Sequence, residues 1–117
     1  MIEGIHHIAL IVSSGESISF YEKLGFTVFY KKQREYDLVI LMRGYGIELE
    51  LFVDSKYPEK TEGLETLGIR HLALKVDDIE TVAETLELEI GPIQNDWMGI
   101  RFAYVKDPDG ILIELHE

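Results

Sequence analysis

Two histidines and two glutamates recur at one fixed spacing along this 117-residue chain. His7 and His71 lie 64 residues apart (71 − 7), and Glu50 and Glu114 have the same separation (114 − 50). Imidazole nitrogens and carboxylate oxygens are common ligands of divalent metal ions. Such a set could hold one ion, and a carboxylate within it could also transfer a proton.

The sequence around these residues is duplicated at the same offset. The segment at 4–12, GIHHIALIV, is matched by GIRHLALKV at 68–76, and GIELEL at 46–51 is matched by GILIEL at 110–115. Agreement at two separate places indicates an internal repeat rather than a chance likeness of apolar strands. The register also favours Glu50 over its neighbour Glu48, because only Glu50 has a glutamate at the equivalent position.

The four residues are predicted to lie on strands, on the side away from the helices. Alternation places the apolar row of each strand on one face and His7, His71, Glu50 or Glu114 on the other. His6 points the opposite way from His7 and is expected to be structural. Each unit has one helix, which can cover only one face, so the four side chains should share the uncovered face.

A carboxylate on that face needs a partner. Removing an ionised glutamate from water costs several kcal/mol unless it is paired or bound to a metal. Taken singly, a histidine on an apolar strand is more often a hydrogen-bonded core residue, and a glutamate on an edge strand is more often solvated. The symmetric set of four favours a divalent metal instead.

The elements that position these residues form two strand–helix–three-strand units. In the first unit we expect a strand at 4–12, a helix at 15–24, and strands at 26–32, 36–43 and 46–53. In the second unit we expect a strand at 68–76, a helix begun by Asp77 as N-cap with Glu80 three residues later, and strands at 88–93, 100–106 and 110–116.

The expected organisation is one domain over residues 1–117. Its parts are a first βαβββ module at 1–53, a polar linker at 54–67 and a second βαβββ module at 68–117. No apolar run approaches the ~20 residues of a membrane span. The start lacks a basic region followed by an apolar core, and cysteine is absent, so we expect a cytoplasmic protein.

The net charge of −11 argues against polyanionic partners. A surface with 22 acidic and 11 basic residues repels nucleic acid and anionic membranes. We therefore expect neither as a partner. The expected partner, a small-molecule substrate, comes from the candidate site and not from the charge.

Several motifs resemble the vicinal-oxygen-chelate (glyoxalase/bleomycin resistance/dioxygenase) superfamily, and within it the glyoxalase I-like (lactoylglutathione lyase-like) proteins. They are HIAL at 7–10, FY at 20–21, LGF at 24–26, EL at 50–51, HLALKVDD at 71–78, DPDG at 107–110 and IEL at 113–115. The likeness covers essentially the whole chain. It implies an α+β fold in which two tandem βαβββ modules form a curved, mostly antiparallel sheet around a central metal site. The implied metal ligands are His7, Glu50, His71 and Glu114.

The resemblance also implies a reaction. Extradiol dioxygenases and fosfomycin-modifying enzymes of this superfamily use three-ligand sets, whereas two histidines with two glutamates resemble its isomerase branch. The implied activity is a metal-dependent lyase or isomerase acting on a hemithioacetal of a 2-oxoaldehyde, by proton transfer through a metal-bound enediolate. Glu114 is the nominated base, with Glu50 as its symmetric partner. Ni²⁺ is favoured by the compact, bacterial-like length, with Zn²⁺, Co²⁺, Fe²⁺ or Mn²⁺ as alternatives.

Other residues are weaker candidates for substrate contact. Arginines could bind a substrate carboxylate, and apolar side chains in the loop before the last hairpin could cover the site. These residues are Arg34, Arg43, Arg101, Trp97 and Met98, and His116 shares a strand face with Glu114.

Two other functions stay open. One is a metal-free drug- or metabolite-binding protein of the bleomycin-resistance type, although such a protein has no need of all four ligand-type residues. The other is a metal-dependent epimerase acting on another small substrate. Relatives often build their sites from two chains, so we expect a homodimer.

Overall fold

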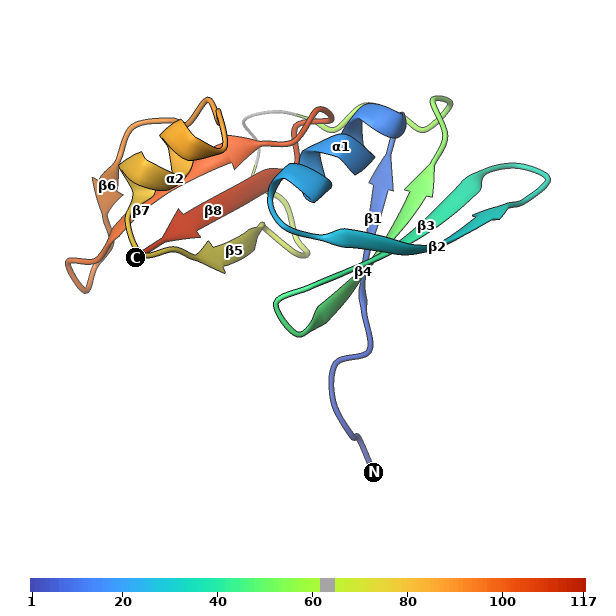
Figure 1. Ribbon diagram of the computed structural model, residues 1–117, viewed down its shortest axis with the longest axis horizontal. Helices are drawn as coiled ribbons and strands as arrows, with labels where there is room; N and C mark the ends of the chain where they lie inside the picture. Colours follow the sequence, from blue (N-terminus) through green and yellow to red (C-terminus); the bar gives the residue numbers. More distant parts are fainter. Residues whose placement is uncertain (62–64) are drawn as a thin grey trace. The chain divides into compact units, whose positions relative to one another are not determined.

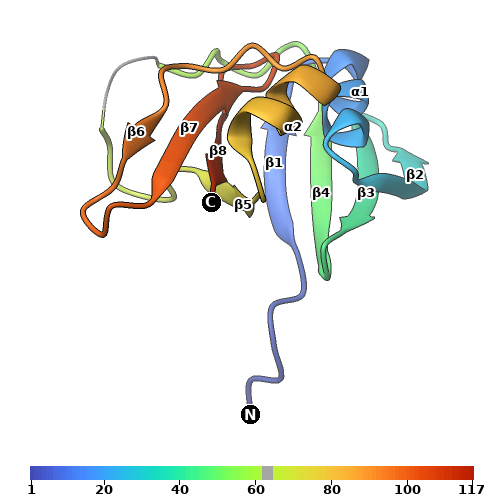
Figure 2. The same cartoon turned by 60° about the vertical axis from the view of Figure 1, so that its left-hand side comes forward.

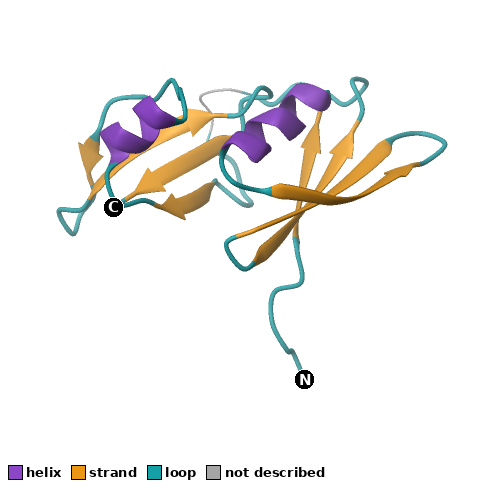
Figure 3. Cartoon of the chain, in the orientation of Figure 1, coloured by secondary structure: helices purple, strands orange, loops and turns teal. Residues whose placement is uncertain are grey.

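The computed structural model describes residues 1–61 and 65–117 and divides into two compact units, Met1–Glu59 and Lys60–Glu117 (Figure 1). Within the described residues, each unit contains one helix and a four-stranded sheet in the order strand, helix, three strands (Figure 3). The predicted α+β class and the two βαβββ modules are therefore confirmed. The predicted linker at 54–67 includes residues 62–64, which lie outside the described residues.

The first unit contains β1 (Ile8–Val12), α1 (Gly15–Lys23), β2 (Thr27–Gln33), β3 (Leu38–Gly44) and β4 (Ile47–Val53). Its sheet has the order β1-β4-β3-β2, which can be followed in Figure 2. The pair β1–β4 is parallel, and the other two pairs are antiparallel. The Ser14 side chain caps α1 by accepting from the Glu16 N–H.

The core of the first unit lies on one face of this sheet. Leu49 and Leu51 of β4 are fully buried, and in register with them on β3 are Met42 and Ile40, also fully buried. Tyr21 of α1 is fully buried as well. The period of two along β4 therefore turns the intervening Glu48 and Glu50 to the other face.

The second unit contains β5 (Leu72–Lys75), α2 (Ile79–Thr85), β6 (Gln94–Asn95), β7 (Arg101–Lys106) and β8 (Leu112–His116). The sheet order β5-β8-β7-β6 and the parallel pair β5–β8 repeat the first unit. Ile79 of α2 forms a buried cluster with Ala103 and Leu115. Among the described residues, no helix has the length and apolar character that a membrane crossing requires.

The turn before β8 is built around a buried carboxylate. Asp107 Oδ1 accepts hydrogen bonds of 2.8 Å from the N–H groups of Asp109 and Ile111, while Gly110, at φ +85°, closes the turn. Only 4% of Asp107 is exposed. This turn fixes where β8, and with it Glu114, begins.

Three local predictions were wrong. The strands expected at 4–12 and 68–76 begin only at Ile8 and Leu72, the first residues that pair with β4 and β8. Asp78, not Asp77, caps α2, since its carboxylate reaches the Thr81 N–H. The strand expected at 88–93 is absent; Leu88 and Ile90 pack on the second core instead, leaving β6 as two residues.

Candidate metal centre

The duplicated residues occupy equivalent places in the two units. Glu50 on β4 lies opposite Ala9 of the parallel strand β1, and Glu114 on β8 lies opposite Ala73 of β5. His7 and His71 each stand one residue before these edge strands. Each unit therefore presents one imidazole beside one carboxylate, on the face away from its buried core.

In the first unit, His7 Nε2 lies 3.0 Å from Glu50 Oε2. The other ring nitrogen, Nδ1, lies 2.9 Å from His6 Nδ1, and the two rings meet edge to face. His6, expected to be structural, is exposed and touches the candidate ligand directly. A neutral imidazole can accept a hydrogen bond, so His6 can accept from an N–H at His7 Nδ1.

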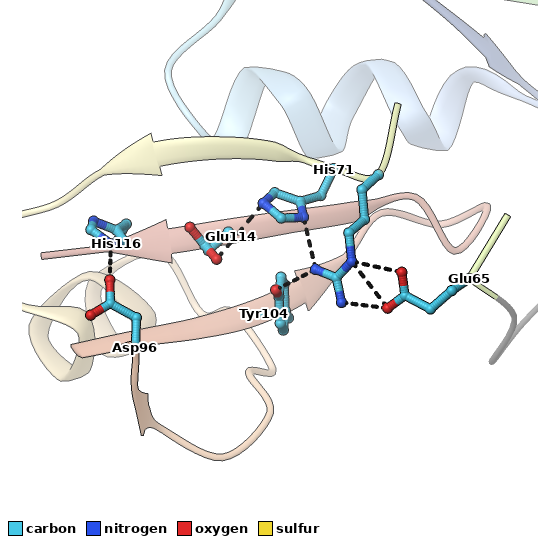
Figure 4. Close-up of polar contacts among 7 residues, drawn as sticks. Glu65, His71, Asp96, Tyr104, Glu114 and His116 are labelled. Atoms are coloured by element: carbon cyan, nitrogen blue, oxygen red, sulfur yellow. Dashed lines mark hydrogen bonds and ion pairs between the residues drawn. The ribbon is translucent and has the colours of Figure 1, made fainter. Parts of the chain in front are cut away.

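In the second unit, His71 Nε2 lies 3.7 Å from Glu114 Oε1 (Figure 4). The Tyr104 ring packs against the His71 ring with centroids 5.5 Å apart. Tyr104 is also the β7 residue in register with Glu114. The pair is more loosely joined than its counterpart, and the Glu114 side chain is 14% exposed against 23% for Glu50.

Arg70 contacts the second ring nitrogen of His71. Its Nη1 lies 3.2 Å from His71 Nδ1 and donates to the Tyr104 hydroxyl at 2.8 Å. The rest of the guanidinium binds the Glu65 carboxylate with N–O distances of 2.7–3.1 Å. These hydrogen bonds lower the pKa of Glu65 and raise that of Arg70.

Arg70 is not among the site residues predicted from the sequence. A signal was available, because Arg70 takes the place of His6 in the repeat. A residue that differs between two otherwise matching segments, directly beside a candidate ligand, indicates a neighbour specific to one unit.

His116 and Asp96 form a second polar pair on this face. His116 Nε2 lies 3.1 Å from Asp96 Oδ2, while Asp96 Oδ1 accepts from the N–H groups of Met98 and Ile100 at 2.8 and 2.9 Å. The Ile100 N–H, together with His116 and Met98, lowers the pKa of Asp96. In the resulting turn Trp97 is 92% exposed, and Met98 beside it is also exposed.

The three arginines proposed from sequence as substrate contacts all bind carboxylates. Arg34 makes two hydrogen bonds of 2.6 Å to the buried Asp37, whose pKa this contact lowers. Arg43 stacks on Phe29 and lies 3.4 Å from Glu48. The partners of Arg101 are Glu80 and Glu117.

A separate group of carboxylates lies at the start of α2. One oxygen each of Asp78, Glu80 and Glu117 lies within 4.8 Å of the others. Arg101 pairs with two of them, the Asp78 carboxylate accepts from Thr81, and Glu117 accepts from the Ile79 N–H. This group therefore caps a helix and already contains a cation.

The chemistry of the duplicated residues suits a divalent ion. Each unit offers an imidazole nitrogen and a carboxylate oxygen, the borderline donors that first-row metals accept. Both pairs are partly exposed to solvent, so an ion could reach either. Each pair alone supplies two protein ligands, whereas zinc sites usually have three or four.

Known proteins resemble the chain over its full length. The model of the glyoxalase/bleomycin resistance protein/dioxygenase superfamily matches residues 4–115. An uncharacterized protein of Bacillus subtilis, YwkD, is 39% identical, with 100% of this chain and 98% of that protein covered. A probable lactoylglutathione lyase of Vibrio parahaemolyticus is 30% identical over 95% of this chain and 87% of its own.

Solved structures show the same family likeness. The crystal structure of a glyoxalase family protein from Enterococcus faecalis superimposes with a TM-score of 0.87 at 33% identity, covering 98% of both chains. Matching sequence, duplicated modules and fold lead to one conclusion: the chain belongs to the glyoxalase/bleomycin resistance protein/dioxygenase superfamily.

Proposed function

We propose that this protein is a metal-dependent lyase or isomerase of the glyoxalase I type, acting on the hemithioacetal of a 2-oxoaldehyde. The observation that carries the proposal is the duplicated pair of His7 with Glu50 and His71 with Glu114, each on the uncovered face of its sheet. The relatives named as probable lactoylglutathione lyases support the same reaction class.

His7, Glu50, His71 and Glu114 would hold the ion together, within one chain or between two chains of a homodimer. We favour Ni²⁺, with Zn²⁺, Co²⁺, Fe²⁺ and Mn²⁺ as alternatives. When bound, a divalent cation supplies Lewis acidity, which polarises adjacent oxygens and makes the C–H between them more acidic.

Glu114 is the proposed base. Its oxygen lies 3.7 Å from His71 Nε2, so the carboxylate is less tightly engaged than Glu50, which lies 3.0 Å from His7. A carboxylate that is held loosely on the reacting face can take the substrate proton on one oxygen and return it to the neighbouring carbon. Glu50 would remain the firmer ligand.

The test combines metal analysis with an activity assay. Purified wild type is loaded with Ni²⁺ or Zn²⁺, its metal content is measured, and hemithioacetal isomerisation is followed. His71→Ala should lose the metal and the turnover together. Glu84→Gln is the matched control for substitutions of the glutamates, because Glu84 is exposed on α2.

Each result favours one function. Stoichiometric metal with turnover supports the proposal. Metal without turnover would favour an epimerase on another small substrate. If the protein takes up no metal under any loading, the result would favour a metal-free drug- or metabolite-binding function. Sedimentation of the loaded protein tests the homodimer, and a monomer that still binds metal would contradict a site shared between chains.

A further inference from the structure

Arg70 brings a cation to the candidate metal centre, and nothing in the proposed reaction uses it. We propose that Arg70 binds a negatively charged group of the substrate, and that metal binding at His71 frees it to do so. The inference rests on the proposed function and adds to it a substrate class, namely a metal-chelating compound that carries a separate carboxylate.

The first step concerns the two nitrogens of His71. A guanidinium donates hydrogen bonds and cannot accept them, so Arg70 Nη1 at 3.2 Å requires the lone pair of His71 at Nδ1. A neutral ring in this arrangement would carry its hydrogen on Nε2, the nitrogen facing Glu114. A metal bound through Nε2 needs the opposite arrangement, with the proton on Nδ1.

Metal binding therefore puts two N–H groups against each other. The proton on Nδ1 would point at the Arg70 N–H, and the cation would also face the charge of the ion. Arg70 must then withdraw from His71. One guanidinium N–H loses its acceptor next to the site where substrate is expected, which makes it available to an incoming anion.

The present partner of Arg70 shows which kind of ligand its guanidinium binds. Glu65 approaches Nε and Nη2 side-on, the two-point geometry by which arginine recognises carboxylates. The side chains are 51% and 72% exposed, and exposed ion pairs are weak. A substrate carboxylate can thus replace Glu65 at little cost.

Tyr104 keeps the guanidinium near the reacting face. Its hydroxyl accepts from Nη1 at 2.8 Å, its ring packs on His71, and it lies in register with Glu114. The surrounding unit is strongly acidic: residues 60–117 contain 5 Lys or Arg and 13 Asp or Glu. An anion therefore needs a local cation to bind here, and Arg70 provides it.

The test uses Arg70→Gln with Lys75→Gln as a charge-matched control. Lys75 lies on β5, four residues beyond His71, and binds the Glu117 main-chain carbonyl. Zn²⁺ affinity is measured by competition with a chelator, after circular dichroism has established that each variant is folded. Arg70→Gln should bind Zn²⁺ roughly tenfold more tightly, whereas Lys75→Gln should match the wild type.

The second measurement uses two hydroxamates on the Zn²⁺-loaded protein, both chelating through two oxygens. Succinic monohydroxamate carries a carboxylate on its tether, and its carboxamide analogue is neutral at the same place. Calorimetry should show the wild type preferring the carboxylate about tenfold or more, and Arg70→Gln losing that preference. Glu65→Gln should strengthen carboxylate binding by removing the internal competitor.

The outcomes separate the two proposals. Unchanged or weaker Zn²⁺ affinity in Arg70→Gln, or equal binding of both hydroxamates by the wild type, overturns the role of Arg70 and leaves the metal-dependent function standing. A wild type that binds no metal overturns both.

Discussion

The two units repeat one fold, yet they surround the same histidine differently. In the first unit His7 Nδ1 contacts His6, a side chain able to accept a hydrogen bond from it, and His7 Nε2 lies 3.0 Å from Glu50. In the second unit His71 Nδ1 meets Arg70, which cannot accept, and Nε2 lies 3.7 Å from Glu114. The repeat preserved the donor atoms and varied their neighbours.

The difference indicates that the two His–Glu pairs have different roles. The first pair is arranged as metal-binding histidines usually are, with an acceptor available to the second ring nitrogen. The second pair has a looser carboxylate and a cation beside it. If the four residues bind an ion as proposed, the first pair would chiefly hold it and the second would chiefly contact the substrate.

The largest expected effect comes from removing either histidine. If the four donors act together, His7→Ala and His71→Ala should each lose stoichiometric metal and bring turnover to background. Elemental analysis and the hemithioacetal assay measure both. His6→Ala should retain the metal, since His6 is a neighbour of the ligand. If either histidine variant retained its full metal content, the hypothesis that the four residues bind one ion together would be wrong.

Replacing the glutamates should separate the two pairs. Glu114→Gln should lower kcat by about 10²–10⁴-fold, the usual contribution of a general base. Glu50→Gln should mainly weaken metal affinity, so that excess metal restores part of the turnover. Steady-state kinetics over a metal titration distinguish these patterns. The assignment is wrong if the two variants exchange behaviours.

Truncation of a core leucine in each unit tests whether the two units unfold independently. Leu51 is fully buried in the first unit and Leu115 almost fully in the second. Each leucine-to-alanine change should cost about 2–5 kcal/mol of unfolding free energy, measured by denaturant titration. Two separate transitions, each shifted by only one of the changes, would show that the units unfold independently. A single shared transition would show that they unfold together.

The smallest expected effect is a pH dependence specific to the second unit. Hydrogen bonds hold the pKa of Asp96 below its ordinary value of about 4. Its contribution to stability is therefore complete above that value and disappears as pH falls through the lowered pKa. Asp96→Asn should flatten the acid-side fall in Tm below about pH 4. An unaltered slope would mean that Asp96 contributes nothing to it.

Much of this architecture was predictable because it is periodic. Alternation along 46–53 and 110–116 placed the buried leucines, and the offset of 64 residues placed Glu50 and Glu114 in equivalent registers. The turn at 107–110 was identifiable because its residue types serve one purpose, a carboxylate that binds backbone N–H groups and a glycine at positive φ.

The errors arose where tertiary contacts decide the outcome. Residues 88–93 have apolar side chains, but Leu88 and Ile90 contact the helix-side core and so form no strand. Asp77 and Asp78 are both competent caps, and only the path of the chain selects the second. Arg70 was not predicted, although its place in the repeat, where the first unit has His6, was a signal in the sequence. Its contact with Tyr104 of β7, in contrast, depends on the fold.

The histidines and glutamates also differ in how firmly their backbones are held. Glu50 and Glu114 lie in strands with a neighbour on both sides, whereas His7 and His71 stand just outside the ladder. Two donors are thus anchored, and two can shift by small changes of backbone angle. If these four residues bind an ion, such a centre would tolerate ions of unequal radius, and the metal in the purified protein would then depend on the cell's supply more than on a rigid selectivity.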